Sequence, residues 1–314
     1  MTRLSTCVTV VLCAVGALAG AAQQPIFRAL GDAVRVFVTV TDGDGRIVTT
    51  LGKDDFEIRD EGKPQPIILF DNTPQPVRLV VMLDVSGSMV GNLPLLRGAA
   101  AQLVERLGAK DLVRIGSFGH EITISPTFTR NAGELRAALP NDIAPDAPTP
   151  LWRAVDQALD ALGGESDETR PVALVLSDGK DSGPISFRQK NVSQAEIIDR
   201  ARREDVMVFG IGMRSRGARP TPGIGPGGLQ AALMADLTDP GLALVAQHTG
   251  GGYREIRFGQ DLAEAFAQVV DELHSQYLIG FDPPKRDGKV HDLGVRLAKK
   301  GMKTRARRSY VAPK

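Results

Sequence analysis

The chain has 314 residues, of which 42% are hydrophobic, 24% charged and only 5% aromatic. This composition is too apolar and too weakly charged for a chain that is disordered throughout, and the length fits about two domains. The 38 Lys and Arg residues nearly balance the 37 Asp and Glu residues, which gives a net charge of +1. A near-neutral chain whose basic stretch lies only near its end argues against a nucleic-acid binder.

Residues 1–22 have the pattern of a secretory signal peptide. Arg3 precedes an apolar run, Val8–Ala19, and small residues follow it. About 12 apolar residues are short for a membrane span, which needs roughly 20. We expect cleavage to give an exported protein without a stable membrane span, either periplasmic, extracellular or at the cell surface; an uncleaved N-terminal anchor is the alternative. Cys7 and Cys13 lie in this segment, so the mature chain would hold no disulfide, zinc-thiolate site or cysteine nucleophile.

Residues 26–76 predict a small β-domain that resembles a sandwich. Apolar and polar side chains alternate along Val34–Val40, which is typical of a strand. Phe56–Arg59 and Ile67–Phe70 are further short strands, and the Pro-containing stretch Asn72–Pro76 has the composition of a linker. Residues 275–314 return to β patterns and are candidates to pair with this N-terminal domain. Their expected strands are Tyr277–Phe281, Val290–Leu297 and Thr304–Val311.

Between these parts, residues 77–274 alternate strand and helix patterns, which predicts a doubly wound, mainly parallel, Rossmann-like α/β sheet. The expected strands are Leu79–Leu83, Leu112–Phe118, Val172–Leu176, Val206–Ile211 and Tyr253–Ile256. The expected helices are Leu95–Leu107, Ala132–Leu139, Leu151–Leu162, Ala195–Arg203, Leu242–His248 and Leu262–Leu273.

Carboxylate and hydroxyl side chains gather where two strands of this sheet end. Leu79–Leu83 leads into Asp84-Val85-Ser86-Gly87-Ser88, which places one carboxylate and two hydroxyls at alternate positions. Val172–Leu176 leads into Ser177-Asp178-Gly179, and Thr149 opens the helix between them. Turns after parallel strands share one sheet edge, so the three segments can meet at the topological switch point. Such hard oxygen donors suit Mg²⁺, Mn²⁺ or Ca²⁺ and not zinc or copper.

The ordered set Asp84, Ser86, Ser88, Thr149 and Asp178 resembles the metal-ion-dependent adhesion site of the von Willebrand factor A-domain family. The resemblance implies that Ser86 and Ser88 bind the metal directly and that Thr149 binds it directly or through water. It implies that Asp84 and Asp178 act mainly through waters and hydrogen bonds.

This resemblance covers about Val77–Leu273. With Asp54-Asp55-Phe56 and Asp60–Lys63 ahead of it, the whole chain is also similar to secreted bacterial von Willebrand factor A-related proteins. The family implies that the remaining metal ligand is an acidic side chain of a partner protein. We therefore expect an exported, non-enzymatic binding or adhesion module that holds Mg²⁺, with Mn²⁺ or Ca²⁺ as alternatives, and captures an Asp or Glu carboxylate.

Three alternative interpretations stay open, one for the motif and two for the function of the chain. Asp84-x-Ser86-x-Ser88 could be only a polar turn that caps a helix. The chain could be a metal-independent scaffold or assembly factor of the cell envelope. It could also be a metal-assisted hydrolase, although the expected metal shell offers no general base beyond groups already committed to the ion.

Other motifs are weaker. Asp42–Gly45 begins like a calcium loop, but Arg46 occupies the fifth position and the twelfth is not Glu, so we predict a hairpin turn. Gly210-Ile211-Gly212 follows a strand but lacks the third glycine of a dinucleotide-binding motif. The four histidines have no metal-binding spacing. The basic stretch Lys299–Arg308 alternates, which predicts an exposed strand face and not a lipid or nucleic-acid patch.

A Gly- and Pro-rich loop, Arg214–Gly228, follows strand Val206–Ile211 and should leave the sheet at the same edge as the metal site. We hypothesise that Arg214, Arg216 and Arg219 help to select the partner by meeting acidic groups around the captured carboxylate. The alternative is a surface loop without a role.

Overall fold

The computed structural model describes residues 33–164, 169–177, 181–183, 191–214, 240–257 and 262–314. All the described residues belong to one compact unit. The predicted signal peptide with its two cysteines lies outside the described residues, as do Asp178, Arg216 and Arg219. Within the described ranges, no helix is long and apolar enough to cross a membrane.

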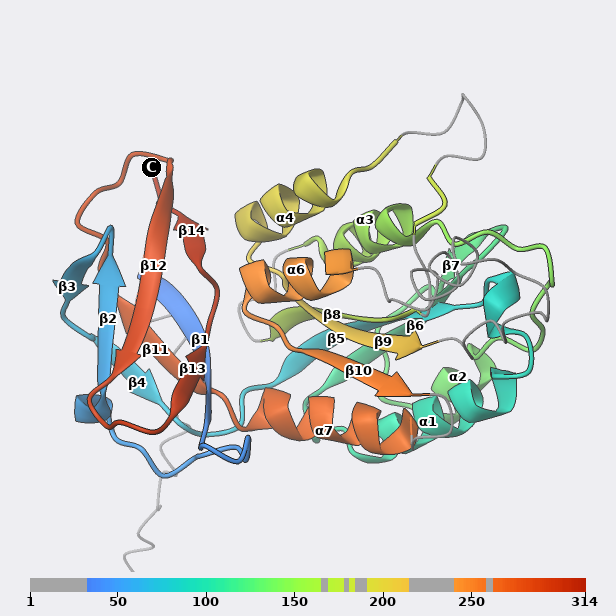
Figure 1. The fold of residues 1–314 in the computed structure, drawn as a ribbon, viewed down its shortest axis with the longest axis horizontal. Coiled ribbons are helices and arrows are strands. Elements are labelled where there is room, and N and C mark those ends of the chain that lie inside the picture. Colours follow the sequence, from blue (N-terminus) through green and yellow to red (C-terminus); the bar gives the residue numbers. More distant parts are fainter. Residues whose placement is uncertain (1–32, 165–168, 178–180, 184–190, 215–239, 258–261) are drawn as a thin grey trace, which may run out of the picture. The chain divides into compact units, whose positions relative to one another are not determined.

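A six-stranded sheet in the order β10-β9-β8-β5-β6-β7 forms the centre of the α/β region (Figure 1). Its strands are β5 (Val77–Asp84), β6 (Leu112–Phe118), β7 (Ile122–Ile124), β8 (Arg170–Ser177), β9 (Met207–Arg214) and β10 (Tyr253–Arg257). All neighbours are parallel except β6 and β7. The predicted doubly wound, mainly parallel sheet is therefore confirmed. The edge strand β7 was not predicted, because three residues are too few to show a period.

Helices cover both faces of this sheet. They are α1 (Leu93–Glu105), α2 (Ala132–Ala137), α3 (Leu151–Leu162), α4 (Gln194–Arg203), α6 (Pro240–Thr249) and α7 (Leu262–His274). Successive residues of β5 point to opposite faces. Val81 and Leu83 pack in the core with α1 and α7, whereas Val80 and Met82 pack in the core with α3, α4 and α6. Burial on both faces explains why β5 is apolar almost without interruption.

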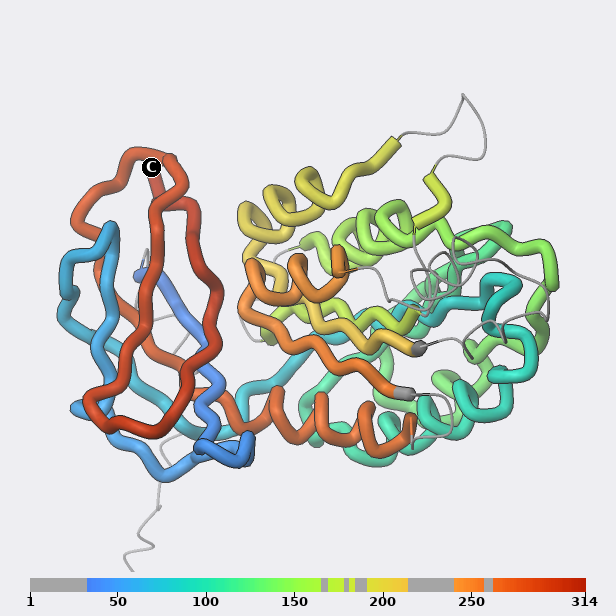
Figure 2. The backbone as a smooth tube through the Cα atoms, in the orientation of Figure 1, coloured from blue at the N-terminus to red at the C-terminus, as the bar shows by residue number. Residues whose placement is uncertain are grey.

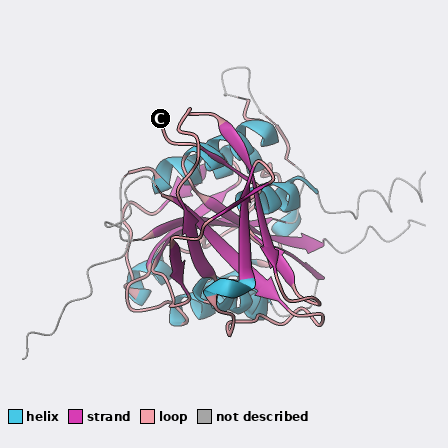
Figure 3. Cartoon of the chain, turned by 90° about the vertical axis from the view of Figure 1, so that its left-hand side faces the viewer, coloured by secondary structure: helices cyan, strands magenta, loops and turns pink. Residues whose placement is uncertain are grey.

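Strands from both ends of the described chain form a second, β-rich region. Its two four-stranded antiparallel sheets have the orders β13-β1-β11-β4 and β14-β12-β2-β3. The strands are β1 (Val34–Thr41), β2 (Phe56–Asp60), β3 (Lys63–Gln65), β4 (Leu69–Asp71), β11 (Tyr277–Phe281), β12 (Val290–Leu297), β13 (Lys303–Arg305) and β14 (Ser309–Val311). The blue N-terminal and red C-terminal segments therefore run beside one another (Figure 2), and their strands are magenta in Figure 3. One shared core, including Val36, Ile58, Tyr277 and Tyr310, joins the two sheets.

The predicted β segment Thr304–Val311 corresponds to two short strands, β13 and β14. β13 pairs with β1 and β14 pairs with β12, so the chain changes sheets between Arg305 and Ser309. The expectation of an exposed basic face also fails for two residues, because Arg305 forms an ion pair with Glu272 and Arg307 forms one with Asp205. The Arg307 side chain is only 13% exposed. Local alternation could not indicate these partners, which come from distant parts of the sequence.

Asp42–Gly45 forms the predicted turn. The amide of Asp42 donates to the carbonyl of Arg46 at 2.9 Å, and the Asp42 carboxylate accepts from the amides of Asp44 and Arg46 at 2.9 and 2.8 Å. One carboxylate oxygen is thus committed to backbone amides, as in a tight Asx-type turn.

Candidate functional site

Asp84, the last residue of the central strand β5, has a fully buried side chain. Its Oδ1 accepts a hydrogen bond from the amide of Ser86 at 2.8 Å, and its Oδ2 accepts one from the hydroxyl of Ser177 at 2.5 Å. Ser177 ends β8, which neighbours β5 in the sheet. The carboxylate therefore joins two strand ends and fixes the start of the turn that holds the two serines.

Ser86 and Ser88 lie in a tight turn after β5, with their Oγ atoms 3.1 Å apart. Ser86 is buried, at 1% exposure, whereas Ser88 is exposed. The turn includes a short 3-10 helix, Gly87–Met89, and the amide of Gly87 donates to the carbonyl of Ala147 at 2.9 Å. A Cβ at Gly87 would lie 2.0 Å from the carbonyl oxygen of Pro145, so only glycine allows this close approach.

Thr149 lies in the same loop as Ala147, just before α3. Its amide donates to the hydroxyl of Ser182 at 3.2 Å, and the amide of Ser182 donates to the carbonyl of Thr149 at 2.9 Å. Asp181, beside Ser182, accepts from the amide of Trp152 in the first turn of α3 at 3.2 Å. A carboxylate is favoured there by the helix dipole. The segment after β8 is thus bound to the loop that holds Thr149.

Three hydrogen-bonded links therefore connect the segments that hold the predicted residues. They are Ser177 to Asp84, Gly87 to Ala147, and Ser182 to Thr149 in both directions. β5 lies between β6 and β8, so the links are at the point where the chain changes direction across the sheet. Asp178, the fifth predicted residue, lies outside the described residues, next in sequence to Ser177.

The donors that the structure does describe fit a hard divalent cation. All are carboxylate or hydroxyl oxygens, the ligands that Mg²⁺ and Ca²⁺ prefer. Octahedral Mg²⁺ with bonds of about 2.0–2.1 Å separates neighbouring ligands by about 2.9 Å. The separation of 3.1 Å between the hydroxyls of Ser86 and Ser88 is close to that value. Among the described residues, no group of three or more His, Cys, Asp or Glu could hold a metal, so hydroxyl ligands are essential to this site.

The sequence did not indicate two further features of this site. One is the hydrogen bond from Ser177 to Asp84. Its signal is the strand register, because Leu83 pairs with Leu176 and the next residues on the two strands are Asp84 and Ser177. The other is an exposed contact between His120 Nε2 and Asp146 Oδ1 at 3.2 Å. The hydrogen bond from His120 lowers the pKa of the Asp146 carboxyl.

Most of the predicted partner-selecting loop, Arg214–Gly228, lies outside the described residues. β9 is parallel to β8 and ends at Arg214, so the chain leaves the sheet at the edge where β8 ends. Arg216 and Arg219 lie outside the described residues, as does the Arg214 side chain. Their role in partner selection stays a prediction.

Residues 79–226 match the family model described as von Willebrand factor type A domain. The resemblance in fold is thus confirmed for this part of the chain, and the α/β region has a von Willebrand factor A-like fold. The sheet extends past the matched residues, because β10 pairs with β9. No curated protein matches the sequence.

Several solved structures are similar to the chain. BatB from Bacteroides thetaiotaomicron is 18% identical, with a TM-score of 0.46 over 63% of this chain and 98% of that chain. The von Willebrand factor domain of the type V pili tip protein Mfa5 from Porphyromonas gingivalis is 12% identical. Its TM-score is 0.46, over 63% of this chain and 95% of that chain. The pilus adhesin SpaC from Lactobacillus rhamnosus GG is 12% identical, with a TM-score of 0.44 over 84% of this chain but only 43% of that chain.

Proposed function

We propose that the protein is an exported, non-enzymatic binding module that captures an Asp or Glu of a partner protein through a divalent cation. Asp84, Ser86, Ser88, Thr149 and Asp178 would hold the ion. The observation that supports this most is the set of three hydrogen-bonded links among the segments that contain these residues. A polar turn that only caps a helix would not need such links to the loop before α3 and to the end of β8.

Each side chain has a distinct part in this proposal. Asp84 is buried and uses both carboxylate oxygens to hold Ser86 and Ser177, so it orients the turn. Ser88 is exposed, so its hydroxyl lies at the surface where a partner can approach. When bound, the ion would supply an electrophilic position for an outside carboxylate. Two Asp charges would roughly balance a divalent ion and leave it able to attract that group.

Mg²⁺ is the cation that we propose first. The 3.1 Å spacing of the Ser86 and Ser88 hydroxyls fits the octahedral shell of Mg²⁺, and the seven-coordinate shell of Ca²⁺ also accommodates it. Mn²⁺ would use the same oxygen donors. The proposed export depends on residues 1–22, and sequencing the N-terminus of the mature protein tests it.

Capture of a carboxylate is tested by binding of immobilised acidic peptides to the purified protein. The matched control peptides carry Asn or Gln in place of Asp or Glu, which removes the charge and keeps the shape. We expect binding to the acidic peptides only, in the presence of Mg²⁺, and release by a chelator. Equal binding of both peptides, or acidic-peptide binding that a chelator leaves unchanged, would contradict the proposal and favour a metal-independent scaffold.

A further inference from the structure

A separate cavity of about 450 Å³ lies among strands of the β-rich region and helix α6. Its lining comes from β1, from β12, from the segment 303–308 and from Gln247 of α6. Its volume is in the range of small-molecule binding sites, about 300–1,000 Å³. None of the residues of the proposed metal site lines it.

The cavity is strongly basic. Lys303, Arg305, Arg307 and Arg308 line it, and neither Asp nor Glu is among the described residues of the lining. Arg305 and Arg307 have acidic partners behind the cavity wall, Glu272 and Asp205. Lys303 and Arg308 are exposed and form no ion pair within the described part of the chain.

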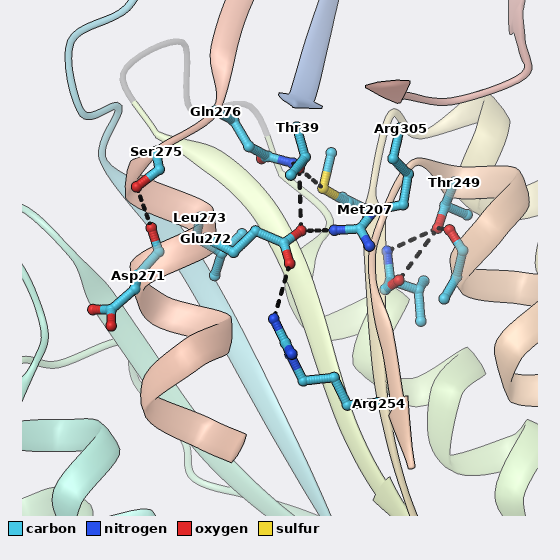
Figure 4. Close-up of polar contacts among 12 residues, drawn as sticks. Thr39, Met207, Thr249, Arg254, Asp271, Glu272, Leu273, Ser275, Gln276 and Arg305 are labelled. Carbon is cyan, nitrogen blue, oxygen red and sulfur yellow. Dashed lines mark hydrogen bonds and ion pairs between the residues drawn. The ribbon is translucent and has the colours of Figure 1, made fainter. Parts of the chain in front are cut away.

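The acidic partners do not balance the positive charge around them. Glu272 is 3% exposed, and it contacts both Arg305 and, at 3.7 Å, Arg254, while the hydroxyl of Thr39 donates to it at 3.2 Å (Figure 4). Burial and the nearby charge of Arg254 lower the pKa of the Arg305 guanidinium to about 10. The Nε–H groups of Arg305 and Arg307 are buried without a hydrogen-bond acceptor among the described residues. Additional negative charge at this place would therefore be stabilised.

The remaining lining groups suit a polar molecule larger than an inorganic ion. Thr41 and the amide of Gln247 offer hydrogen-bonding groups, and Leu293 and Val295 add apolar surface. Arginine and lysine are the side chains that proteins use most to bind phosphate-type oxyanions, because they supply several charged N–H donors.

We propose that this cavity binds a small molecule of about sugar size that carries a phosphate or sulfate group. Lys303 and Arg308 contact the oxyanion, and the hydroxyl of Thr41 and the amide of Gln247 contact its polar body. This binding is independent of a metal, so it is separable from capture of a carboxylate at the proposed metal site.

Calorimetry and thermal melts in the presence of a chelator, at constant ionic strength, test the proposal. The probes are glucose, glucose 6-phosphate and glucose 6-sulfate. We expect saturable binding and a raised melting temperature with one or both charged sugars and neither effect with glucose. The phosphate and sulfate probes then show which oxyanion is preferred.

The variant for this test is the double substitution Lys303→Ala with Arg308→Ala, both at exposed positions. Lys63→Ala with Lys285→Ala is the matched control, since it removes the same charge from exposed positions elsewhere in the β-rich region. We expect the first variant to weaken binding by at least about tenfold and the control to bind like the wild type. Lys303→Gln with Arg308→Gln keeps more of the side-chain volume. It replaces the alanine variant in the binding test if that variant does not fold. The proposal is overturned if none of the charged probes binds saturably or if both double variants weaken binding equally.

Discussion

The hydroxyl of Ser177 donates a hydrogen bond of 2.5 Å to the fully buried carboxylate of Asp84, and so connects the ends of two central parallel strands. The other oxygen of the same carboxylate holds the amide of Ser86. A buried charge is tolerated only where hydrogen bonds or opposite charges compensate it. Asp84 is therefore both a structural link and the residue that orients the proposed metal-binding turn.

Replacing Asp84 by Ala should lower the free energy of unfolding by about 2–4 kcal/mol, because the Ser177 hydroxyl and the Ser86 amide both lose a charged acceptor. Asp84→Asn keeps the shape and one acceptor, so its cost should be smaller. Urea denaturation with a chelator present measures both without any contribution from metal. Glu121→Ala, at an exposed position of the same region, is the control and should change stability little. An Asp84→Ala protein as stable as this control would contradict the role of the carboxylate.

Gly87→Ala should disturb the turn directly, since a Cβ there meets the carbonyl oxygen of Pro145 at 2.0 Å. We expect a loss of about 1–3 kcal/mol in unfolding free energy and weaker Mg²⁺ binding as the backbone shifts. Gly98→Ala is the matched control, because a Cβ at that position in α1 has nothing within 4 Å. Alanine should stabilise the helix by about 0.5–1 kcal/mol. A lower unfolding free energy for Gly87→Ala and a higher one for Gly98→Ala would support the close approach of Gly87 to Pro145. Equal changes in the two variants would refute it.

The buried contacts of His291 with two carboxylates should make the free energy of unfolding depend on pH. Its ring is 5% exposed, with Nδ1 3.0 Å from Asp60 and Nε2 3.3 Å from Asp287. Tyr310, the other titratable group packed against it, donates its hydroxyl to Asp60 at 2.9 Å. Burial opposes the charged imidazole, but the hydrogen bond and charge of Asp60, with the charge of Asp287, outweigh burial and raise its pKa above 6.5.

A raised pKa in the folded state means that folding favours the protonated ring. The stabilisation is fully present below pH 6.5, the unfolded value, and is lost as the pH rises through the higher folded pKa. We expect His291→Gln to lose stability chiefly at the acidic end, so that its difference from wild type shrinks above neutral pH. His248 contributes in the opposite direction, since burial lowers its pKa, and the difference between variant and wild type removes that contribution. Thr127→Ala, at an exposed position without a titratable side chain, is the control. A difference that grows with pH would contradict the assignment.

The buried carboxylate of Glu272 should contribute to the free energy of unfolding through its three polar partners. Glu272→Ala leaves Arg305, Arg254 and Thr39 without the carboxylate that they share. Because Arg305 and Arg254 are each about one-third exposed, we expect a loss smaller than the roughly 3–5 kcal/mol of a fully buried pair, about 2–3 kcal/mol. Glu264→Ala, on the exposed side of the same helix, should have little effect. Denaturant unfolding of the two variants checks this, and similar stability for both would contradict it.

Much of the fold was predictable because its signals are local. β6, α3, β11 and β12 have the predicted bounds, since continuous apolar runs or clear helical periods mark each of them. The Asp84-x-Ser86-x-Ser88 pattern was equally local, because it follows a strand that is buried on both faces.

What was not predictable depends on partners that are distant in sequence. Nothing in Thr304–Val311 indicates that its two halves pair with β1 and β12, or that Arg305 meets Glu272. The link between Ser177 and Asp84 spans 93 positions and follows only from the pairing of β5 with β8. Such contacts are set by the tertiary fold and leave no local period in the sequence.

The central claim, that the turn after β5 and its neighbouring loops hold a divalent cation, is tested most directly by titrating Mg²⁺ into the purified protein with an acidic peptide present. Wild type is compared with Ser88→Ala and with Thr127→Ala, which removes an exposed hydroxyl elsewhere in the α/β region. We predict saturable binding that Ser88→Ala weakens by at least about tenfold and Thr127→Ala leaves unchanged. Folded wild-type protein that binds no Mg²⁺, or a Ser88→Ala protein that binds it equally well, would contradict the account.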